Sequence, residues 1–145
     1  NFEMSELSAM LKSAFPYFLL MAAGSINSTI PDIQGDIETG KITTAVRIGT
    51  QKANLMSIVF ITAALAVSFI NGNAVAIMAS CISLPLFIKY HLTGSMSDAK
   101  RSYEIGGGSL LLLISFIVPG YMLAGLITFF ATRLYFRKRY GIRYP

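Results

Sequence analysis

Charged residues are strongly segregated from apolar ones along this chain. Asp, Glu, Lys and Arg are absent from three long stretches, residues 13–31, 53–88 and 105–132. A transmembrane helix needs about 20 mostly apolar residues to cross a hydrocarbon core of roughly 30 Å. The three stretches therefore predict an all-α integral membrane protein built as a bundle of transmembrane helices, with no sheet.

Turn residues divide two of these stretches. Residues 53–88 are too many for one crossing at about 1.5 Å per residue, and Asn71-Gly72-Asn73 in their middle predicts a tight turn. Pro119-Gly120 divides residues 103–136, where proline breaks or kinks a helix. These divisions predict about five transmembrane spans. The alternative is that residues 103–136 form one kinked span instead of two. We expect helices near Leu11–Thr29, Asn54–Ile70, Ala74–Leu92, Tyr103–Val118 and Gly120–Arg137.

Composition and charge agree with a membrane location. Hydrophobic residues make up 54% of the chain and charged residues 13%, whereas soluble domains carry about 25% charged residues. The net charge is +5, but basic residues lie at the ends of apolar runs and form no stripe, which does not favour nucleic-acid binding. By the positive-inside rule, which counts Lys and Arg, the polar segment after Asp32 and the segments 89–101 and 133–143 are predicted to be cytoplasmic. We therefore expect a multi-pass protein of the cell inner membrane or its equivalent.

Two carboxylates begin the longest polar segment, residues 32–52. Asp32 and Asp36 are four residues apart and project to the same side if the segment is helical. Mg²⁺ keeps several waters and is usually held by one or two carboxylates plus substrate phosphates. Lys41 and Arg47 follow closely, and such cations suit a pyrophosphate. A solvated, charge-balanced loop has the same spacing, so spacing alone leaves both interpretations open.

The wider sequence around these acids carries more information. Residues 32–49, DIQGDIETGKITTAVRIG, resemble the second aspartate-rich motif of the UbiA superfamily of membrane prenyltransferases. The motif there is close to D-x-x-G-D-x-x-x-G-x-x-T-x-x-x-x-x-G, and every fixed position is filled here. The tail, residues 139–145, is also similar to the endings of some members.

The resemblance implies a helical bundle of two pseudo-repeated halves, each contributing one aspartate-rich loop. Together these loops hold Mg²⁺ and an isoprenyl diphosphate at the cytoplasmic side. The implied activity is transfer of the prenyl group to an aromatic or other lipophilic acceptor in the membrane. Asp32 and Asp36 would be the metal ligands and catalytic residues, with Lys41 and Arg47 as candidate diphosphate contacts. Asn27, near the end of the preceding apolar run, is a further candidate to face the site.

The chain departs from the family pattern in two respects. The first motif, an Asn followed by two Asp at four-residue spacing, is not in the 145 residues. We therefore expect residues 1–145 to be one transmembrane region, the carboxy-terminal half of a longer protein. The missing amino-terminal half would carry the first motif, and this half alone would be inactive. The family also usually has three spans after the second motif, whereas four are counted here.

Two other functions are alternatives to the prenyltransferase interpretation. A helical subunit of a membrane transporter could use Asp32 and Asp36 to handle ions, since carboxylates line such pathways. Transporters, however, place charges or broken helices near the bilayer midplane, while these acids lie in a predicted loop. The CDP-alcohol phosphotransferases also use Mg²⁺ in the membrane, but they need upstream Asp, Gly and Arg residues that the segment before Asp32 does not supply.

Overall fold

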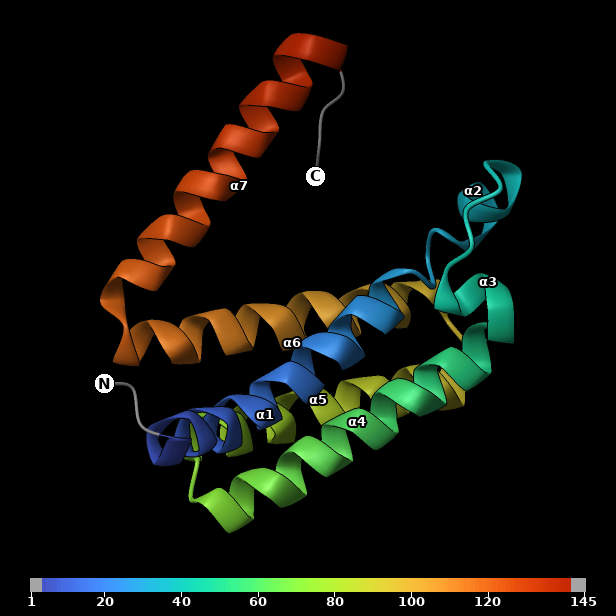
Figure 1. The fold of residues 1–145 in the computed structure, drawn as a ribbon. Helices are drawn as coiled ribbons and strands as arrows, with labels where there is room; N and C mark the ends of the chain where they lie inside the picture. The colour runs from blue at the N-terminus through green and yellow to red at the C-terminus, as the bar shows by residue number, and fades with distance from the viewer. Residues whose placement is uncertain (1–3, 142–145) are drawn as a thin grey trace. The chain divides into compact units, whose positions relative to one another are not determined.

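A computed structural model of the chain describes residues 4–141, and its regular structure there is entirely helical (Figure 1). The helices are α1 Met4–Ser28, α2 Ile33–Glu38, α3 Thr44–Ile48, α4 Thr50–Asn71, α5 Ala74–Thr93, α6 Met96–Ile117 and α7 Pro119–Tyr140. Within residues 4–141 there is no strand. The prediction of an all-α fold is confirmed.

Three of the described helices are long and apolar enough to cross a membrane, namely α1, α4 and α5. They indicate a membrane protein. The helix α6 begins with a charged stretch that includes Asp98, Arg101 and Glu104, and α7 ends in a basic one. These charged ends shorten the apolar parts of the last two helices, and the total of five spans stays a prediction.

The helices extend beyond the ranges expected from the sequence. α1 begins at Met4 instead of near Leu11, and α6 begins at Met96 instead of near Tyr103. The expected ranges followed uncharged residues, because only these mark the part of a span inside hydrocarbon. A helix itself continues through Lys, Arg and Glu, which have good helix propensity, so its ends lie farther out.

The turn predicted at Asn71-Gly72-Asn73 joins α4 to α5. Gly72 has the left-handed φ of 64°. Its N–H donates to the carbonyl of Phe69 at 3.3 Å, and the Asn73 N–H donates to that of Ser68 at 2.9 Å. This pair of bonds is the Schellman motif. Asn73 then caps α5, because its Oδ1 accepts from the Ala76 N–H at 3.1 Å. The tight turn is confirmed.

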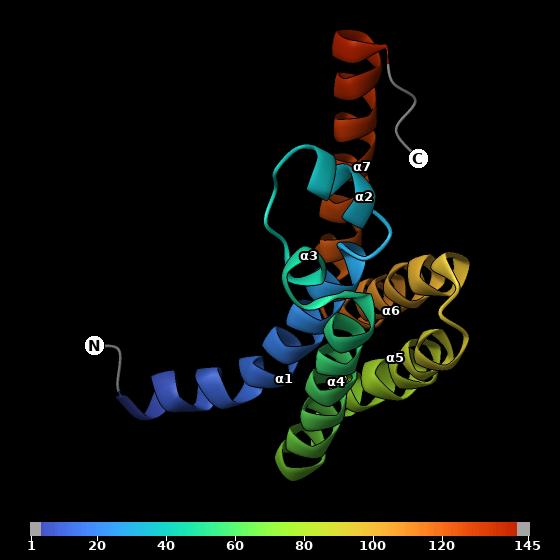
Figure 2. The ribbon, with the colours of Figure 1, turned by 90° about the vertical axis from the view of Figure 1, so that its right-hand side faces the viewer.

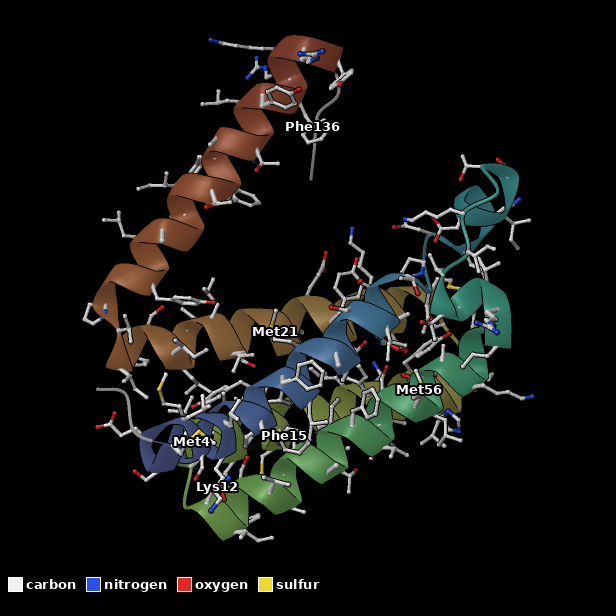
Figure 3. All side chains as sticks on the ribbon, viewed as in Figure 1. Met4, Lys12, Phe15, Met21, Met56 and Phe136 are labelled. Atoms are coloured by element: carbon white, nitrogen blue, oxygen red, sulfur yellow. The ribbon has the colours of Figure 1, made fainter. Side chains whose placement is uncertain are left out.

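Two hydrogen bonds tie α1 to this turn. The Tyr17 hydroxyl donates to Asn73 Oδ1 at 2.9 Å, and Asn71 Nδ2 donates to the Lys12 carbonyl at 2.9 Å. Figure 3 shows Lys12 beside the end of α4. The turn is therefore held to the side of α1 as well as closed within itself.

Residues up to Leu110 form one compact unit and those from Leu111 another, and each is described by itself. In the first unit, α1, α4 and α5 lie side by side (Figures 1 and 2). Small residues such as Ala23, Ala64 and Ala79 are fully buried there. Small side chains let helix backbones approach closely, as in membrane helix packing.

In the second unit, the helical conformation is interrupted at Val118, between α6 and α7. Val118 is extended, with φ −124° and ψ 86°, as expected for a residue that precedes proline. The division predicted at Pro119 is therefore confirmed. Pro16 and Pro85 lie inside α1 and α5 without ending either helix, so proline alone does not fix a break.

A small apolar core closes one end of the first unit. It consists of residues exposed by 1% or less, Ile30, Ala45, Ala53, Tyr90 and Ala99, with Ile26 and Ile33 packed against it. These residues come from all six helices α1 to α6 and from the segment between α1 and α2. The core therefore lies where segment 32–52 meets the bundle, and it positions the candidate site.

Candidate functional site

The polar segment after α1 folds into the two short helices α2 and α3, not into an open loop. α2 ends at Glu38, and Gly40 follows two residues later with a φ of 72°. The Lys41 N–H donates to the Asp36 carbonyl at 2.8 Å, and the Gly40 N–H donates to that of Ile37 at 3.1 Å. This is a second Schellman motif. It favours a glycine at position 40 and turns Lys41 back towards Asp36.

Two further fixed positions of the aspartate-rich motif also shape the backbone. Thr43 caps α3, because its Oγ1 accepts from the Val46 N–H at 3.4 Å. Gly49 separates α3 from α4 with φ 84° and ψ 156°, a region that residues with a Cβ scarcely enter. The backbone conformation thus explains why Gly40, Thr43 and Gly49 stand at their positions.

Asp36 is buried, with 7% of its surface exposed. Its Oδ1 lies 3.3 Å from the Lys41 ammonium. Its Oδ2 is buried and has no hydrogen-bond partner. A buried polar atom without a partner is costly, so this oxygen is available to a water, a cation or another ligand.

Asp32 lies one helical turn before Asp36, immediately ahead of α2. Its carbonyl accepts from the Asp36 N–H at 2.9 Å. Its exposed side chain makes no capping hydrogen bond, although it stands at the N-cap position. The carboxylate is therefore not used to hold the helix.

The two candidate cations are placed differently. Lys41 contacts Asp36, and 67% of its side chain is exposed. Arg47 lies exposed in the last turn of α3, and the ion pairs found among residues 4–141 do not include one to either aspartate. The structure thus brings Lys41 into the candidate site and leaves Arg47 apart from it.

Asn27 is fully buried and faces α6. Its Nδ2 donates to Ser102 Oγ at 2.7 Å, and Ser102 Oγ donates to the Ala99 carbonyl at 2.7 Å. The Asn27 Oδ1 has no partner. The contacts described join Asn27 to helix packing and not to Asp32 or Asp36.

The donor set of this site fits one half of a magnesium site. Residues 4–141 contain no group of three or more His, Cys, Asp or Glu side chains that could hold a metal by themselves. Mg²⁺ does not need such a group, because it is usually held by one or two carboxylates, with waters and substrate phosphates completing its shell. The unpartnered oxygen of Asp36 and the uncommitted carboxylate of Asp32 are suitable hard-oxygen ligands.

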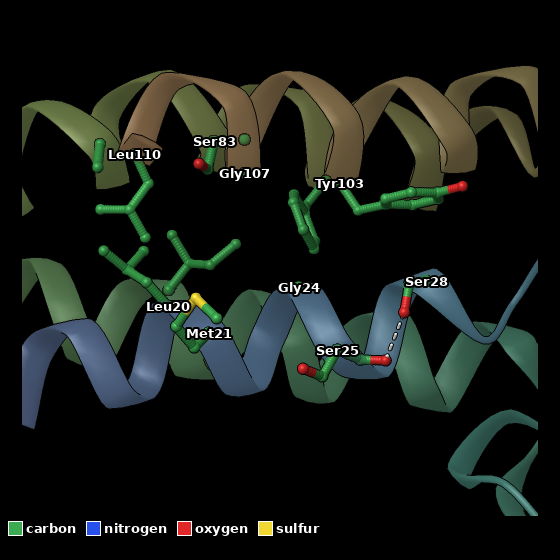
Figure 4. A pocket seen from close by; sticks show the side chains of 13 residues that line it. Leu20, Met21, Gly24, Ser25, Ser28, Ser83, Tyr103, Gly107 and Leu110 are labelled. Carbon is green, nitrogen blue, oxygen red and sulfur yellow. Dashed lines mark hydrogen bonds between the residues drawn. The ribbon is translucent and has the colours of Figure 1, made fainter. Parts of the chain in front are cut away.

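Within the first unit, an apolar cavity of about 260 Å³ lies between α1, α4, α5 and α6 (Figure 4). Its lining residues are Leu20, Met21, Gly24, Ser25, Ser28, Ile61, Ala79, Ser83, Phe87, Tyr103, Gly106, Gly107 and Leu110. Glycines contribute to this space, because a Cβ on Gly24 or Gly107 would meet nothing within 4 Å. Sequence reasoning missed the cavity, although the Gly106-Gly107-Gly108 run in an apolar helix was a signal.

No known protein family matches this sequence, and no curated protein or solved structure gives a match either. The likeness to the UbiA superfamily therefore stays an interpretation of residues 32–49.

Proposed function

We propose that this chain is the carboxy-terminal half of a UbiA-type, Mg²⁺-dependent membrane prenyltransferase. The observation that carries the proposal is the carboxylate of Asp36, which is buried yet keeps Oδ2 without a partner one helical turn from Asp32. The neighbouring motif residues Gly40, Thr43 and Gly49 are explained by the backbone. The two aspartates are the motif residues that we assign to metal binding.

Each polar residue has a defined part in this proposal. Asp32 and Asp36 hold Mg²⁺, with water and the first motif of the amino-terminal half completing its shell. The bound ion would neutralise charge on the departing pyrophosphate, as a Lewis acid does. Lys41, already beside Asp36, donates to a phosphate oxygen of the isoprenyl diphosphate. Arg47 is a weaker contact, because the structure leaves it apart from the aspartates.

The cavity between the helices is the proposed place for the isoprenyl chain. Its lining reaches Ser28, four residues before Asp32 along the chain. A mostly apolar lining excludes water, which would otherwise capture the allylic cation before the lipophilic acceptor attacks it. Ligand pockets usually measure about 300 Å³ or more, so we propose that the amino-terminal half enlarges this one.

The proposed arrangement in the membrane has five spans. α1, α4 and α5 cross it as the three most apolar helices, and α6 and α7 form a second hairpin around Val118. The uncharged turns at Gly72 and Val118 then lie outside. The segment 32–52, the start of α6 and the end of α7 each contain Lys or Arg residues, and they lie on the cytoplasmic side.

The direct test replaces Asp32 or Asp36 by Asn in the full-length protein. Each variant should lower transfer of a labelled prenyl group by about 100-fold or more, the usual cost of losing a group that stabilises developing charge. Expression and membrane insertion should be unchanged. Glu38→Gln is the matched control, because Glu38 is an exposed acid of α2 and its loss should leave the rate nearly unaltered.

Two outcomes would contradict the proposal. Wild-type rates and Mg²⁺ dependence in both Asn variants would show that these residues are not the metal site. Ion transport without prenyl transfer, lost in the same variants, would support the transporter alternative instead.

A further inference from the structure

The last turns of α7 combine four cations with no neighbouring acid. They are Arg133, Arg137, Lys138 and Arg139, here called the basic collar. No Asp or Glu follows Glu104 in the sequence, and residues 105–132 carry no charge. The collar is therefore a purely basic region, without acidic residues, that directly follows a long uncharged segment.

The cations surround the helix and do not line one face. An α-helix turns by about 100° per residue. Relative to Arg133, the collar residues Arg137, Lys138 and Arg139 stand at about 40°, 140° and 240°. A nucleic acid or a partner helix approaches from one side and would require the charges on that side. A layer of anions that encircles the helix would meet all four.

Aromatic rings are interleaved with the cations. The Arg139 guanidinium carbon lies 5.9 Å from the ring centre of Tyr135 and 5.8 Å from that of Tyr140. Phe136 and Tyr140 have ring centres 5.7 Å apart. Tyrosine rings are enriched where a helix leaves the hydrocarbon for the headgroup layer, and these contacts restrict where the guanidinium can lie.

We propose that the basic collar binds the headgroups of anionic phospholipids at the cytoplasmic face of the membrane. Basic residues next to a span are attracted to anionic leaflets, by about fivefold in affinity for each cation. The inference depends on the membrane placement of α7 in the proposed function, but it does not depend on prenyl transfer. A general preference of cations for a helix C-terminus explains the position of the collar but would give no selectivity between lipids.

The test measures lipid selectivity, not activity. The purified full-length protein in neutral detergent is titrated with phosphatidylglycerol or phosphatidylcholine, and bound lipid is counted by native mass spectrometry. The wild type should prefer phosphatidylglycerol, and the preference should weaken with salt. Replacing all four collar residues by Gln should lower that preference about tenfold or more.

The matched control removes as many cations elsewhere, by Lys12→Gln, Lys52→Gln, Lys100→Gln and Arg101→Gln together, and it should keep the preference. Circular dichroism of both variants checks that helix content is retained. Equal losses in the two variants would overturn the proposal, because bulk charge would then suffice. Displacement of phosphatidylglycerol by equimolar inorganic pyrophosphate would also overturn it, since the collar would then belong to the diphosphate site.

Discussion

Lys41 and Asp36 are joined twice. The Lys41 N–H donates to the Asp36 carbonyl at 2.8 Å, and the Lys41 ammonium lies 3.3 Å from Asp36 Oδ1. The backbone bond belongs to the turn at Gly40, whereas the side-chain contact neutralises only one edge of the carboxylate. One residue therefore shapes the segment through its backbone and presents a cation beside the candidate metal site through its side chain.

Substitution of Lys41 by Ala separates these two roles, because the backbone bond remains. We expect the KM for the isoprenyl diphosphate to rise by about three- to tenfold, the modest value of a charged contact that is largely exposed to solvent. Arg47→Ala should have a smaller effect, and Lys52→Ala serves as the control. Steady-state prenyl transfer in membranes measures the three values. A larger effect at Arg47 than at Lys41 would contradict the placement of the site.

Glycine at position 49 is predicted to be required by the backbone. Its φ of 84° and ψ of 156° suit glycine almost alone, so Gly49→Ala should destabilise the fold by about 1–3 kcal/mol. Gly40→Asn should cost less, because Asn tolerates the left-handed region. Thermal unfolding in detergent measures both. Gly35→Ala is the control, since Gly35 has no positive φ and a Cβ there meets nothing within 4 Å.

Close packing of α6 on α5 is tested at Gly106. A Cβ added there would lie 3.0 Å from Ser83 Oγ and 3.5 Å from Ser83 Cβ. Gly106→Ala should therefore lower the melting temperature, overpacking typically costing about 1–3 kcal/mol, while Gly107→Ala in open space should not. Adding Ser83→Ala should restore much of the loss, because it removes the closest atom. No recovery in the double variant would show that the strain lies elsewhere.

The five-span arrangement makes a prediction about sidedness. After Cys81 is replaced by Ala, single cysteines at Ser97 and Lys138 should react with an impermeant maleimide only from the cytoplasmic side. Cysteines at Gly72 and Gly120 should react only from outside. Labelling of intact cells and of inverted vesicles distinguishes the two sides. Reaction of the Gly120→Cys variant from the cytoplasmic side would contradict a transmembrane hairpin of α6 and α7.

The link between α5 and α6 should be sensitive to acid. The Lys89 ammonium and the Thr93 hydroxyl donate to Asp98 at 2.8 and 2.9 Å, and these bonds hold the Asp98 pKa below its ordinary value of 3.8. A lowered folded-state pKa means that the stabilisation is present above pH 3.8 and is lost as pH falls through the lower value. The melting-temperature advantage of wild type over Asp98→Asn should therefore shrink below about pH 4. A constant difference would contradict this.

The sequence predicted the larger helices and their turns, because uncharged stretches and turn residues act locally. It did not predict α2 and α3, which lie in a segment classed only as polar. Their signals were present: Gly40 permits the Schellman turn and Thr43 caps α3. In that segment, local capping decides the structure and hydrophobic periodicity does not.

The candidate site was predicted less completely than the fold. The spacing of Asp32 and Asp36 predicted one helical turn between them, and the Asp36 N–H donates to the Asp32 carbonyl. Sequence distance could not rank Lys41 above Arg47. That ranking depends on how the chain reverses at Gly40. Asn27 was a candidate to face the site, and its Nδ2 donates to Ser102 while its Oδ1 has no partner among the described residues. Which side of a helix meets its neighbour depends on tertiary packing, and no local pattern encodes it here.

The apolar core beneath the aspartates has a mechanical consequence. Three of its members, Ala45, Ala53 and Ala99, are alanines with no exposed surface, and they share one core with Ile30 and Tyr90. Such short side chains have no rotamers through which to absorb a displacement. Lifting the aspartate-bearing segment would therefore require the ends of several helices to separate together. The segment that carries the two carboxylates is thus anchored to the bundle at Ile30 and Ile33, on either side of Asp32.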